Sequence, residues 1–264
     1  MSDILCAKKI LSLVKKQDFY NLIVLDSVNS TNSYIKKLAV SGTPHATTVI
    51  ADSQTNGRGR LGRDFFSPCG TGIYMSILID PAKIKIPSSH LTIAAGVAVC
   101  HALRNICDDT PSIKWVNDIF LRGKKVCGIL AESVINPKTN TSNYIIVGIG
   151  INVATTAEAF PGKLNGIAGS VFPKNVTRNE IIAKLLDEFD DVCSNAEIEQ
   201  LIEEYKNHSL VLVKKISFTK DGKAFSGTAK DINLDGNLVV VLEDGQKMIL
   251  SSGEVSLGSS NFLR

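Results

Sequence analysis

Apolar runs separated by polar and glycine-rich segments occupy the first 153 residues of the chain. Seven of these runs have the length and the β-branched or aromatic content of strands, and two helical patterns lie between the early ones. The predicted strands are 21–26, 47–52, 72–79, 112–116, 119–121, 126–133 and 144–153. This mixture predicts an α+β domain in which helices flank a sheet.

Helical spacing of apolar residues occurs in four segments. They cover 4–16, a stretch that begins near Ser30, 88–107 and 177–207. The lysine-rich first segment resembles a transit peptide, but Asp3 and the lack of arginine favour a plain amphipathic helix. Ser88 or Ser89 is the expected cap of the third helix. The fourth carries one apolar stripe, which is typical of a core or domain-bridging helix.

The period changes after residue 208. Short apolar runs are separated there by three Asp-Gly pairs, which are strong signals for β-hairpins. The predicted strands are 211–213, 225–229, 238–242 and 248–250, and the pairs are at 221–222, 235–236 and 244–245. We therefore expect two domains, 1–208 and 209–264.

Composition narrows the classes of function. With 264 residues, 44% of them hydrophobic, the chain can bury a full core, and its net charge of +3 is too small for a dedicated nucleic-acid surface. Six cysteines show no CxxC pair and no spacing that matches the four histidines, which speaks against a zinc site. No signal peptide or membrane-length apolar run is evident, so we expect a cytosolic protein.

The segment 54–63 is the most distinctive stretch of the chain. It reads Gln-Thr-Asn-Gly-Arg-Gly-Arg-Leu-Gly-Arg and contains Arg58, Arg60 and Arg63. Glycine lets the main chain approach a ligand, and each guanidinium can bind a carboxylate or a phosphate. Such runs also occur in disordered nucleic-acid-binding tails. Here, however, predicted strands precede and follow the run, which favours an anion-binding loop in a folded domain.

Further motifs follow the ends of other predicted strands. They are Asp-Ser-Val-Asn-Ser-Thr-Asn at 26–32, Lys-Trp-Val-Asn-Asp at 114–118, Gly-Ile-Gly-Ile-Asn at 148–152 and Ser-Gly-Glu-Val-Ser at 252–256. Together with the arginine loop, and in this order, they resemble the motifs of the biotin protein ligases over about residues 21–258. One departure is Val116, which replaces the family's usual proline. Because proline would fix φ, the backbone conformation of the following turn is less defined here.

The resemblance implies a mixed sheet with flanking helices and a small C-terminal SH3-like β-barrel. It also implies a two-step reaction, in which biotin and MgATP give biotinyl-5'-AMP and pyrophosphate before a carrier lysine displaces AMP. The implied partner is the biotin carboxyl carrier domain of an acetyl-CoA or pyruvate carboxylase type enzyme. The segment before residue 21 is too short for the DNA-binding module of some bacterial relatives, so we expect no DNA binding. Monomer and homodimer both remain open.

The site residues implied by the resemblance fall into two overlapping sets. Those for biotin are Ser30, Thr31, Asn32, Gln54, Gly57, Arg58, Gly59, Arg60, Tyr74, Lys114, Gly128 and Gly148. Those for ATP or the adenylate are Arg58, Arg60, Arg63, Lys114, Trp115, Asn117 and Asn152. Lys114, Arg58 and Arg60 are the predicted catalytic residues, Lys125 aligns with a second cationic strand, and 54–69 is the predicted lid. The residues that would bind the Mg²⁺ of MgATP are left open.

Elementary chemistry agrees with this assignment. A carboxylate that attacks the α-phosphorus of ATP is already ionised at neutral pH, so the first step needs fixed cations rather than a general base. Capping of a helix is the alternative role of Ser30 and Thr31, and a core position is the alternative for Trp115. The competing functions are a lipoate ligase, a non-catalytic sensor of biotin or nucleotide, and a nucleic-acid-binding module.

Overall fold

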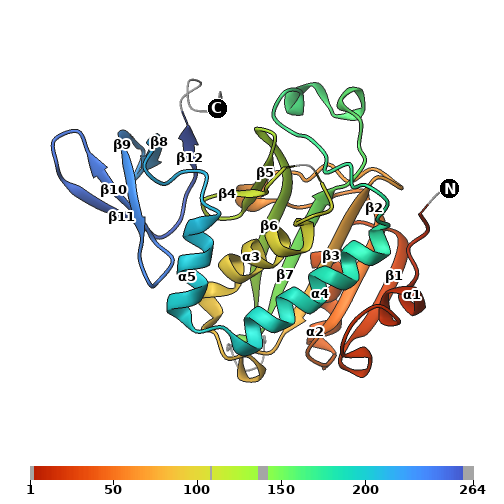
Figure 1. Ribbon diagram of the computed structural model, residues 1–264. Coiled ribbons are helices and arrows are strands. Elements are labelled where there is room, and N and C mark those ends of the chain that lie inside the picture. Colours follow the sequence, from red (N-terminus) through yellow and green to blue (C-terminus); the bar gives the residue numbers. More distant parts are fainter. Residues whose placement is uncertain (1–2, 108, 136–141, 258–264) are drawn as a thin grey trace.

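Seven strands form the main sheet of the computed structural model, which describes residues 3–107, 109–135 and 142–257 (Figure 1). β1 and β2 run parallel, whereas the five further neighbouring pairs run antiparallel, which confirms the predicted mixed sheet. In spatial order the strands are β1 (Asn21–Val28), β2 (Thr47–Gln54), β3 (Gly72–Ile79), β7 (Ser142–Asn152), β6 (Lys124–Ile135), β5 (Asp118–Leu121) and β4 (Ser112–Lys114).

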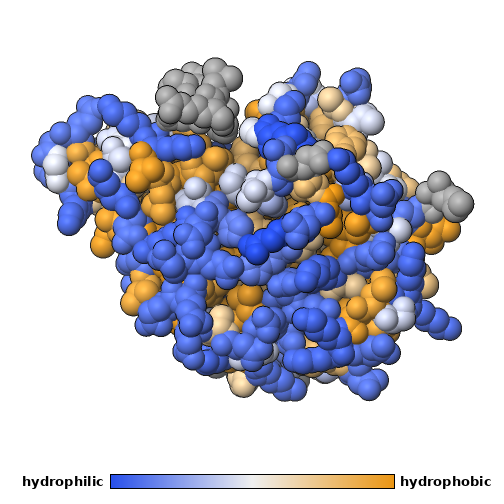
Figure 2. All heavy atoms as spheres, viewed as in Figure 1, coloured by the Kyte–Doolittle hydropathy of each residue, from blue (hydrophilic) through white to orange (hydrophobic). Residues whose placement is uncertain are grey.

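Over the described ranges, five α-helices accompany the strands. They are α1 (Ala7–Leu11), α2 (Thr31–Val40), α3 (Leu91–Leu103), α4 (Arg178–Asn195) and α5 (Ile198–Asn207). In Figure 1, α3 and α4 cross in front of the sheet. Seen from the same side in Figure 2, the outer surface over α4 and α5 is largely hydrophilic, as expected for helices whose apolar stripe faces the core.

Successive side chains along each strand point to opposite faces of the sheet. Val49, Leu78 and Ile146 pack on one face with α2, and they form a small buried cluster with it. The opposite face belongs to the large core, which also contains α3 and α4. Farther along the α2 face the strands carry Gly128 and Gly150, and the candidate site lies over this part of the sheet.

The observed helices differ from the predicted ones at their ends. The first is a single short turn, Ala7–Leu11, rather than 4–16. The last predicted helix is broken at Ala196, whose extended backbone separates α4 from α5. A 3₁₀ turn, Ser88–His90, precedes α3, and no side chain caps that helix, so the predicted Ser88 or Ser89 cap is wrong. Thr177 caps α4 in a full capping box.

A second sheet of five antiparallel strands follows α5, consistent with the expected SH3-like domain. In spatial order its strands are β11 (Lys247–Leu250), β10 (Leu238–Leu242), β9 (Lys223–Ile232), β8 (Lys215–Lys220) and β12 (Val255–Leu257). The three Asp-Gly pairs lie in the turns between β8 and β11, as predicted. The predicted strand 211–213 is wrong, because Val213 has a φ of 58° and is 81% exposed.

The segment between β9 and β10 joins the second sheet to the first part of the chain. The indole N–H of Trp115 donates to the carbonyl of Gly236 at 3.0 Å, and Nε2 of His90 lies 2.7 Å from the carbonyl of Leu234. Apolar residues of both sheets belong to one continuous buried cluster. The domain boundary at 208/209 stays a prediction, and residues 258–264 of the second predicted domain lie outside the described residues.

Candidate active site

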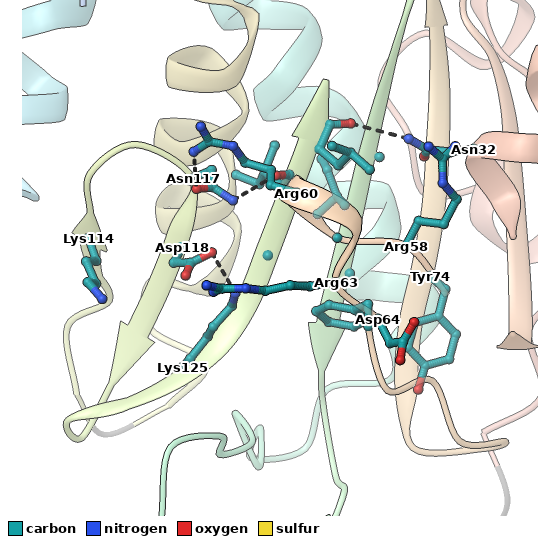
Figure 3. Close-up of a pocket in the computed structure, with 18 of the residues that line it drawn as sticks. Asn32, Arg58, Arg60, Arg63, Asp64, Tyr74, Lys114, Asn117, Asp118 and Lys125 are labelled. Atoms are coloured by element: carbon teal, nitrogen blue, oxygen red, sulfur yellow. Dashed lines mark hydrogen bonds and ion pairs between the residues drawn. The ribbon is translucent and has the colours of Figure 1, made fainter. Parts of the chain in front are cut away.

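A cavity of about 370 Å³ lies on the α2 side of the main sheet (Figure 3). Its wall combines strands β3 to β7, the N-terminus of α2, the arginine loop, the segment around Lys163 and the Gly253–Val255 end of the second sheet. The volume falls in the range of about 300–1,000 Å³ that is typical of sites for small organic ligands. The cavity therefore has the size for a compact ligand.

Strand register builds the floor of this cavity. Six residues from six neighbouring strands oppose one another in one continuous row. The row runs Ala51, Tyr74, Gly150, Gly128, Asp118 and Lys114. Since opposed residues point to the same face of a sheet, groups that are distant in the sequence meet over one surface. The row is flat at its two central glycines and charged at its β4 end.

The glycines leave room for other side chains to lie on the sheet. A Cβ atom at Gly150 would approach the ring of Phe65 to 2.6 Å, and one at Gly148 would approach Oδ1 of Asn32 to 2.1 Å. Distances below 3.0 Å require the neighbour to move. Any larger residue would thus displace Phe65 or Asn32 and narrow the cavity.

Hydrogen bonds fix the polar groups at the α2 end. The backbone and hydroxyl of Thr31 donate to Oε1 of Gln54 at 2.8 and 3.2 Å, and Nε2 of Gln54 donates to the hydroxyl of Ser67 at 2.8 Å. The hydroxyl of Ser76 lies 2.8 Å from that of Thr31 and 2.6 Å from Oδ1 of Asn32. This network presents oriented hydroxyl and amide groups, which suit a neutral polar head group.

Arg58 and Glu132 extend this network to the arginine loop. The guanidinium donates to both carboxylate oxygens of Glu132, at 2.8 and 3.2 Å. Oε2 of the same carboxylate accepts from Nδ2 of Asn32 at 2.8 Å. Glu132 on β6 therefore ties the loop to the start of α2.

The two other loop arginines are held by different elements. Arg60 donates to Oδ1 of Asn117 at 2.8 Å, and Nδ2 of Asn117 donates to the carbonyl of Ile129 at 3.0 Å. Arg63 binds both oxygens of Glu254, just before β12, at 2.6 and 2.5 Å. Side-chain contacts thus hold the loop over the cavity, while its apolar residue Leu61 remains 73% exposed.

Lys114 supplies a cation at the end of the floor. Among the residues that the structure describes, no carboxylate lies within the 4.0 Å of an ion pair to its Nζ, which lies 5.9 Å from the centre of the Phe120 ring. Partial burial lowers the pKa of Lys114, and the charge of Asp118 partly opposes this shift. Nζ of Lys125 lies 2.7 Å from Oδ1 of Asp118 and so neutralises that carboxylate.

Known proteins share this architecture. The model of the Biotin/lipoate A/B protein ligase family matches residues 24–152, and that of the Biotin protein ligase C terminal domain matches 214–258. A biotin–acetyl-CoA-carboxylase ligase of Mycobacterium tuberculosis is 30% identical over 89% of this chain and 88% of its own length. The chain belongs to the biotin protein ligase family. It is thus an enzyme, a ligase.

Two further relatives of this ligase agree with that placement. The bifunctional ligase/repressor BirA of Bacillus spizizenii is 32% identical over 90% of this chain and 74% of its own length. The structure of the biotin protein ligase of Aquifex aeolicus in complex with biotin and ATP superposes with a TM-score of 0.74 at 29% identity, covering 91% of this chain and 99% of the other.

The cavity wall of the ligase contains all but two of the residues predicted for the site. The exceptions are Gly57 and Asn152. Gly57 lies at the base of the arginine loop, where a Cβ atom would be 2.3 Å from the carbonyl of Phe65. Asn152 lies on the same face of β7 as Gly150, and its side chain donates to the carbonyl of Gly169 at 3.0 Å, so it holds a neighbouring segment beside the described wall. Their contacts with a ligand stay predictions.

Three predicted residues have structural roles as well. Ser30 is the N-cap of α2, and its hydroxyl accepts from the backbone of Ser33. Tyr74 is 1% exposed, and its hydroxyl donates to the carbonyl of Pro68 at 2.9 Å. Trp115 is 3% exposed, and its indole N–H donates to the carbonyl of Gly236 in the turn before β10. Its core role is therefore evident, whereas stacking on a nucleotide stays a prediction.

Sequence reasoning missed the wall residue Phe65 and an anchor of the arginine loop, Glu132, which is not part of the described wall. Phe65, which packs over Gly150, and Glu132, which binds Arg58, carry no motif of their own. For Lys125, which the resemblance predicts, sequence reasoning missed only the cause of its orientation. The β5–β6 register shifts by one residue after Ile119 and turns this lysine to the site, and a bulge of this kind leaves little trace in a sequence. Within the described residues, no helix is long and apolar enough to cross a membrane.

Proposed function

We propose that this ligase joins biotin and ATP to biotinyl-5'-AMP, releases pyrophosphate, and then transfers the biotinyl group to a lysine of a carrier domain. The observation that carries the proposal is the floor row, which connects a neutral, hydrogen-bonding end of the cavity to a cationic one. Biotin has this same polarity, with a neutral ureido head at one end and a carboxylate at the other.

The neutral end suits the ureido group. Thr31 and Gln54 are already aligned by mutual hydrogen bonds, so they require little reordering to bind a donor and acceptor pair. Beside them the ring of Phe65 packs on Gly128 and Gly150, and a thioether ring and a short alkyl chain can lie against this aromatic surface. In this orientation the biotin carboxylate points toward Arg60 and Lys114, whereas Arg58 lies beside Asn32 at the neutral end (Figure 3).

The cationic end suits adenylation. A carboxylate attacks the α-phosphorus, the bond from that phosphorus to the bridging oxygen breaks, and pyrophosphate leaves with its electron pair. Lys114 and the loop arginines lower the repulsion between the two anions and stabilise the charge of the transition state. MgATP enters as the substrate. Arg60 and Asn117, which are hydrogen-bonded to each other, are the residues that we assign to the nucleotide.

Transfer requires an amine nucleophile. The carrier lysine attacks the acyl carbon of the mixed anhydride, an amide forms, and AMP leaves. Because this anhydride reacts with water, the loop 54–69 protects it by covering the cavity until the carrier arrives. The acceptor class that we propose is the carrier domain of a biotin-dependent carboxylase.

Purified protein, biotin, MgATP and a carrier domain test this function together. The expected result is that the carrier gains the mass of one biotinyl group, with AMP and pyrophosphate released in equal amounts. A carrier whose acceptor lysine is replaced by arginine serves as the matched control and should gain nothing. Modification with lipoate in place of biotin would favour the lipoate ligase alternative.

A further inference from the structure

Three potential metal ligands meet where α3 and α5 pack. One ligand atom each from His101, Glu204 and His208 lie within 4.8 Å of one another, and all three residues are half-buried. His101 belongs to α3, Glu204 to α5, and His208 directly follows α5. The cluster lies outside the described wall of the ligase cavity.

Acceptors orient both imidazole rings. Nδ1 of His101 lies 3.1 Å from Oε2 of Glu188, whose other oxygen is held by Lys184 at 2.5 Å. Nδ1 of His208 lies 3.2 Å from the carbonyl of Pro111. Since carbonyl and carboxylate oxygens accept, Nδ1 carries the hydrogen in both rings. Metal-binding histidines usually donate one ring N–H to such an acceptor and bind the metal through the other nitrogen.

We propose that Nε2 of His101, Nε2 of His208 and the carboxylate of Glu204 bind one divalent transition-metal ion, for which Zn²⁺ fits best. Two imidazoles and one carboxylate, with water as the fourth ligand, form a common zinc set, whereas Mg²⁺ and Ca²⁺ prefer oxygen alone. Nε2 of His101 is 2.6 Å from Oε1 of Glu204, so the ion replaces the shared proton, which passes to solvent. The side chain of Glu204 is 42% exposed and can move to admit it.

The position of this site indicates a stabilising role. The carbonyl of His208 accepts from the backbone of Ile113 at 2.7 Å, and the carbonyl of Ile113 accepts from Leu210 at 2.8 Å. Ile113 directly precedes Lys114 on β4. A metal that joins α3 to the end of α5 therefore also supports the strand that carries Lys114. This inference does not depend on the identity of the ligase substrate.

The test uses the full-length protein after dialysis against a chelator. We expect calorimetric titration with Zn²⁺ to give one site per chain. A thermal unfolding scan with Zn²⁺ present should give a higher melting temperature than one without it. Glu204→Gln and His208→Gln should each weaken binding by at least about tenfold, and Glu188→Gln by about 10–100-fold because it orients a ligand. His45→Gln is the matched control and should bind as the wild type does. Because Glu204 is partly exposed, its variant should fold even if the histidine variant does not.

Free cysteines also bind Zn²⁺, so the ligand type is checked with Co²⁺. Cys6 and Cys69 are exposed. The proposal predicts a visible Co²⁺ spectrum without a thiolate charge-transfer band. Lack of a stoichiometric site, unchanged affinity in Glu204→Gln, or a thiolate band in the spectrum would each overturn the proposal.

Discussion

Arg58 and Glu132 are 74 residues apart in the sequence and form a two-point ion pair at 2.8 and 3.2 Å. Glu132 also accepts from Asn32 at the start of α2. The loop is therefore held over the cavity by a carboxylate of the sheet. An anionic ligand that engages Arg58 must compete with Glu132 or bind the remaining guanidinium donors.

Glu132→Gln should loosen the arginine loop. The pair is partly exposed, and such pairs contribute about 0.2–1 kcal/mol, which corresponds to at most about a fivefold change in the open population. Limited trypsin digestion should therefore cut faster after Arg58, while Glu199→Gln, an exposed control on α5, leaves the rate unchanged. Equal cleavage rates in both variants would show that Glu132 does not anchor the loop.

Lys114→Ala should slow adenylation by about 100-fold or more, the scale of one lost electrostatic stabiliser. Its ammonium sits at the charged end of the floor row and is not engaged in an ion pair with any described carboxylate. The rate of biotin-dependent exchange between ATP and labelled pyrophosphate measures the effect. Lys36→Ala on α2 is the control. A near-normal exchange rate in Lys114→Ala would exclude this lysine from the mechanism.

The pH dependence of the same rate reports the charge of Lys114. Burial lowers its pKa from the ordinary value of 10.5, so the catalytic cation is lost at a lower pH than for an exposed lysine. The exchange rate should fall as the pH rises through this lowered pKa. Lys114→Arg keeps its charge to higher pH and should shift the fall upward. If the fall of the exchange rate at high pH occurs at the same pH in Lys114→Arg as in the wild type, another group causes it.

Gly150→Ala should weaken the binding of biotin. The added methyl group would lie 2.6 Å from the ring of Phe65, and overpacking of this kind costs about 1–3 kcal/mol. The KM for biotin should rise by about tenfold or more. Gly162→Ala is the matched control, since a Cβ atom there meets no atom within 4 Å. Equal KM values in the two variants would contradict the assigned floor.

Arg60→Gly should release the intermediate. Ordering the loop costs about 1–2 kcal/mol per residue, and one hydrogen bond from arginine to phosphate returns roughly 1.5–3 kcal/mol. Without Arg60, adenylate should still form but escape, so that lysines of bystander proteins become biotinylated. Biotin plus ATP should also protect the wild-type loop from trypsin. Absence of stray labelling, or equal cleavage with and without ligands, would contradict the lid.

Apolar patterning was sufficient to predict every strand of the main sheet, because each carries an apolar run, both in the buried strand β3 and in β1, where no residue is fully buried. It failed at the start of the second sheet. In β8 only Ile216 and Phe218 are buried, and polar residues alternate with them, while the more apolar segment before β8 forms a turn that buries Val211 and exposes Val213. Tertiary context, rather than propensity, decides the structure of such short segments.

The motifs located most of the cavity wall, since glycines and cations recur there in recognisable order. They could not supply its cross-links. Glu132 contacts Arg58, and Glu254 contacts Arg63, only because loops and sheets distant in the sequence converge. The pairing of His101 with His208 depends in the same way on helix packing. Such contacts are set by register and packing angles, which spacing in a sequence does not encode.

Exchange of labelled pyrophosphate into ATP by the purified protein, with biotin and with lipoate in parallel, tests the central claim most directly. The account predicts rapid exchange that depends on biotin and Mg²⁺, little exchange with lipoate, and a loss of about 100-fold or more in Lys114→Ala. Exchange with lipoate but not with biotin would contradict it.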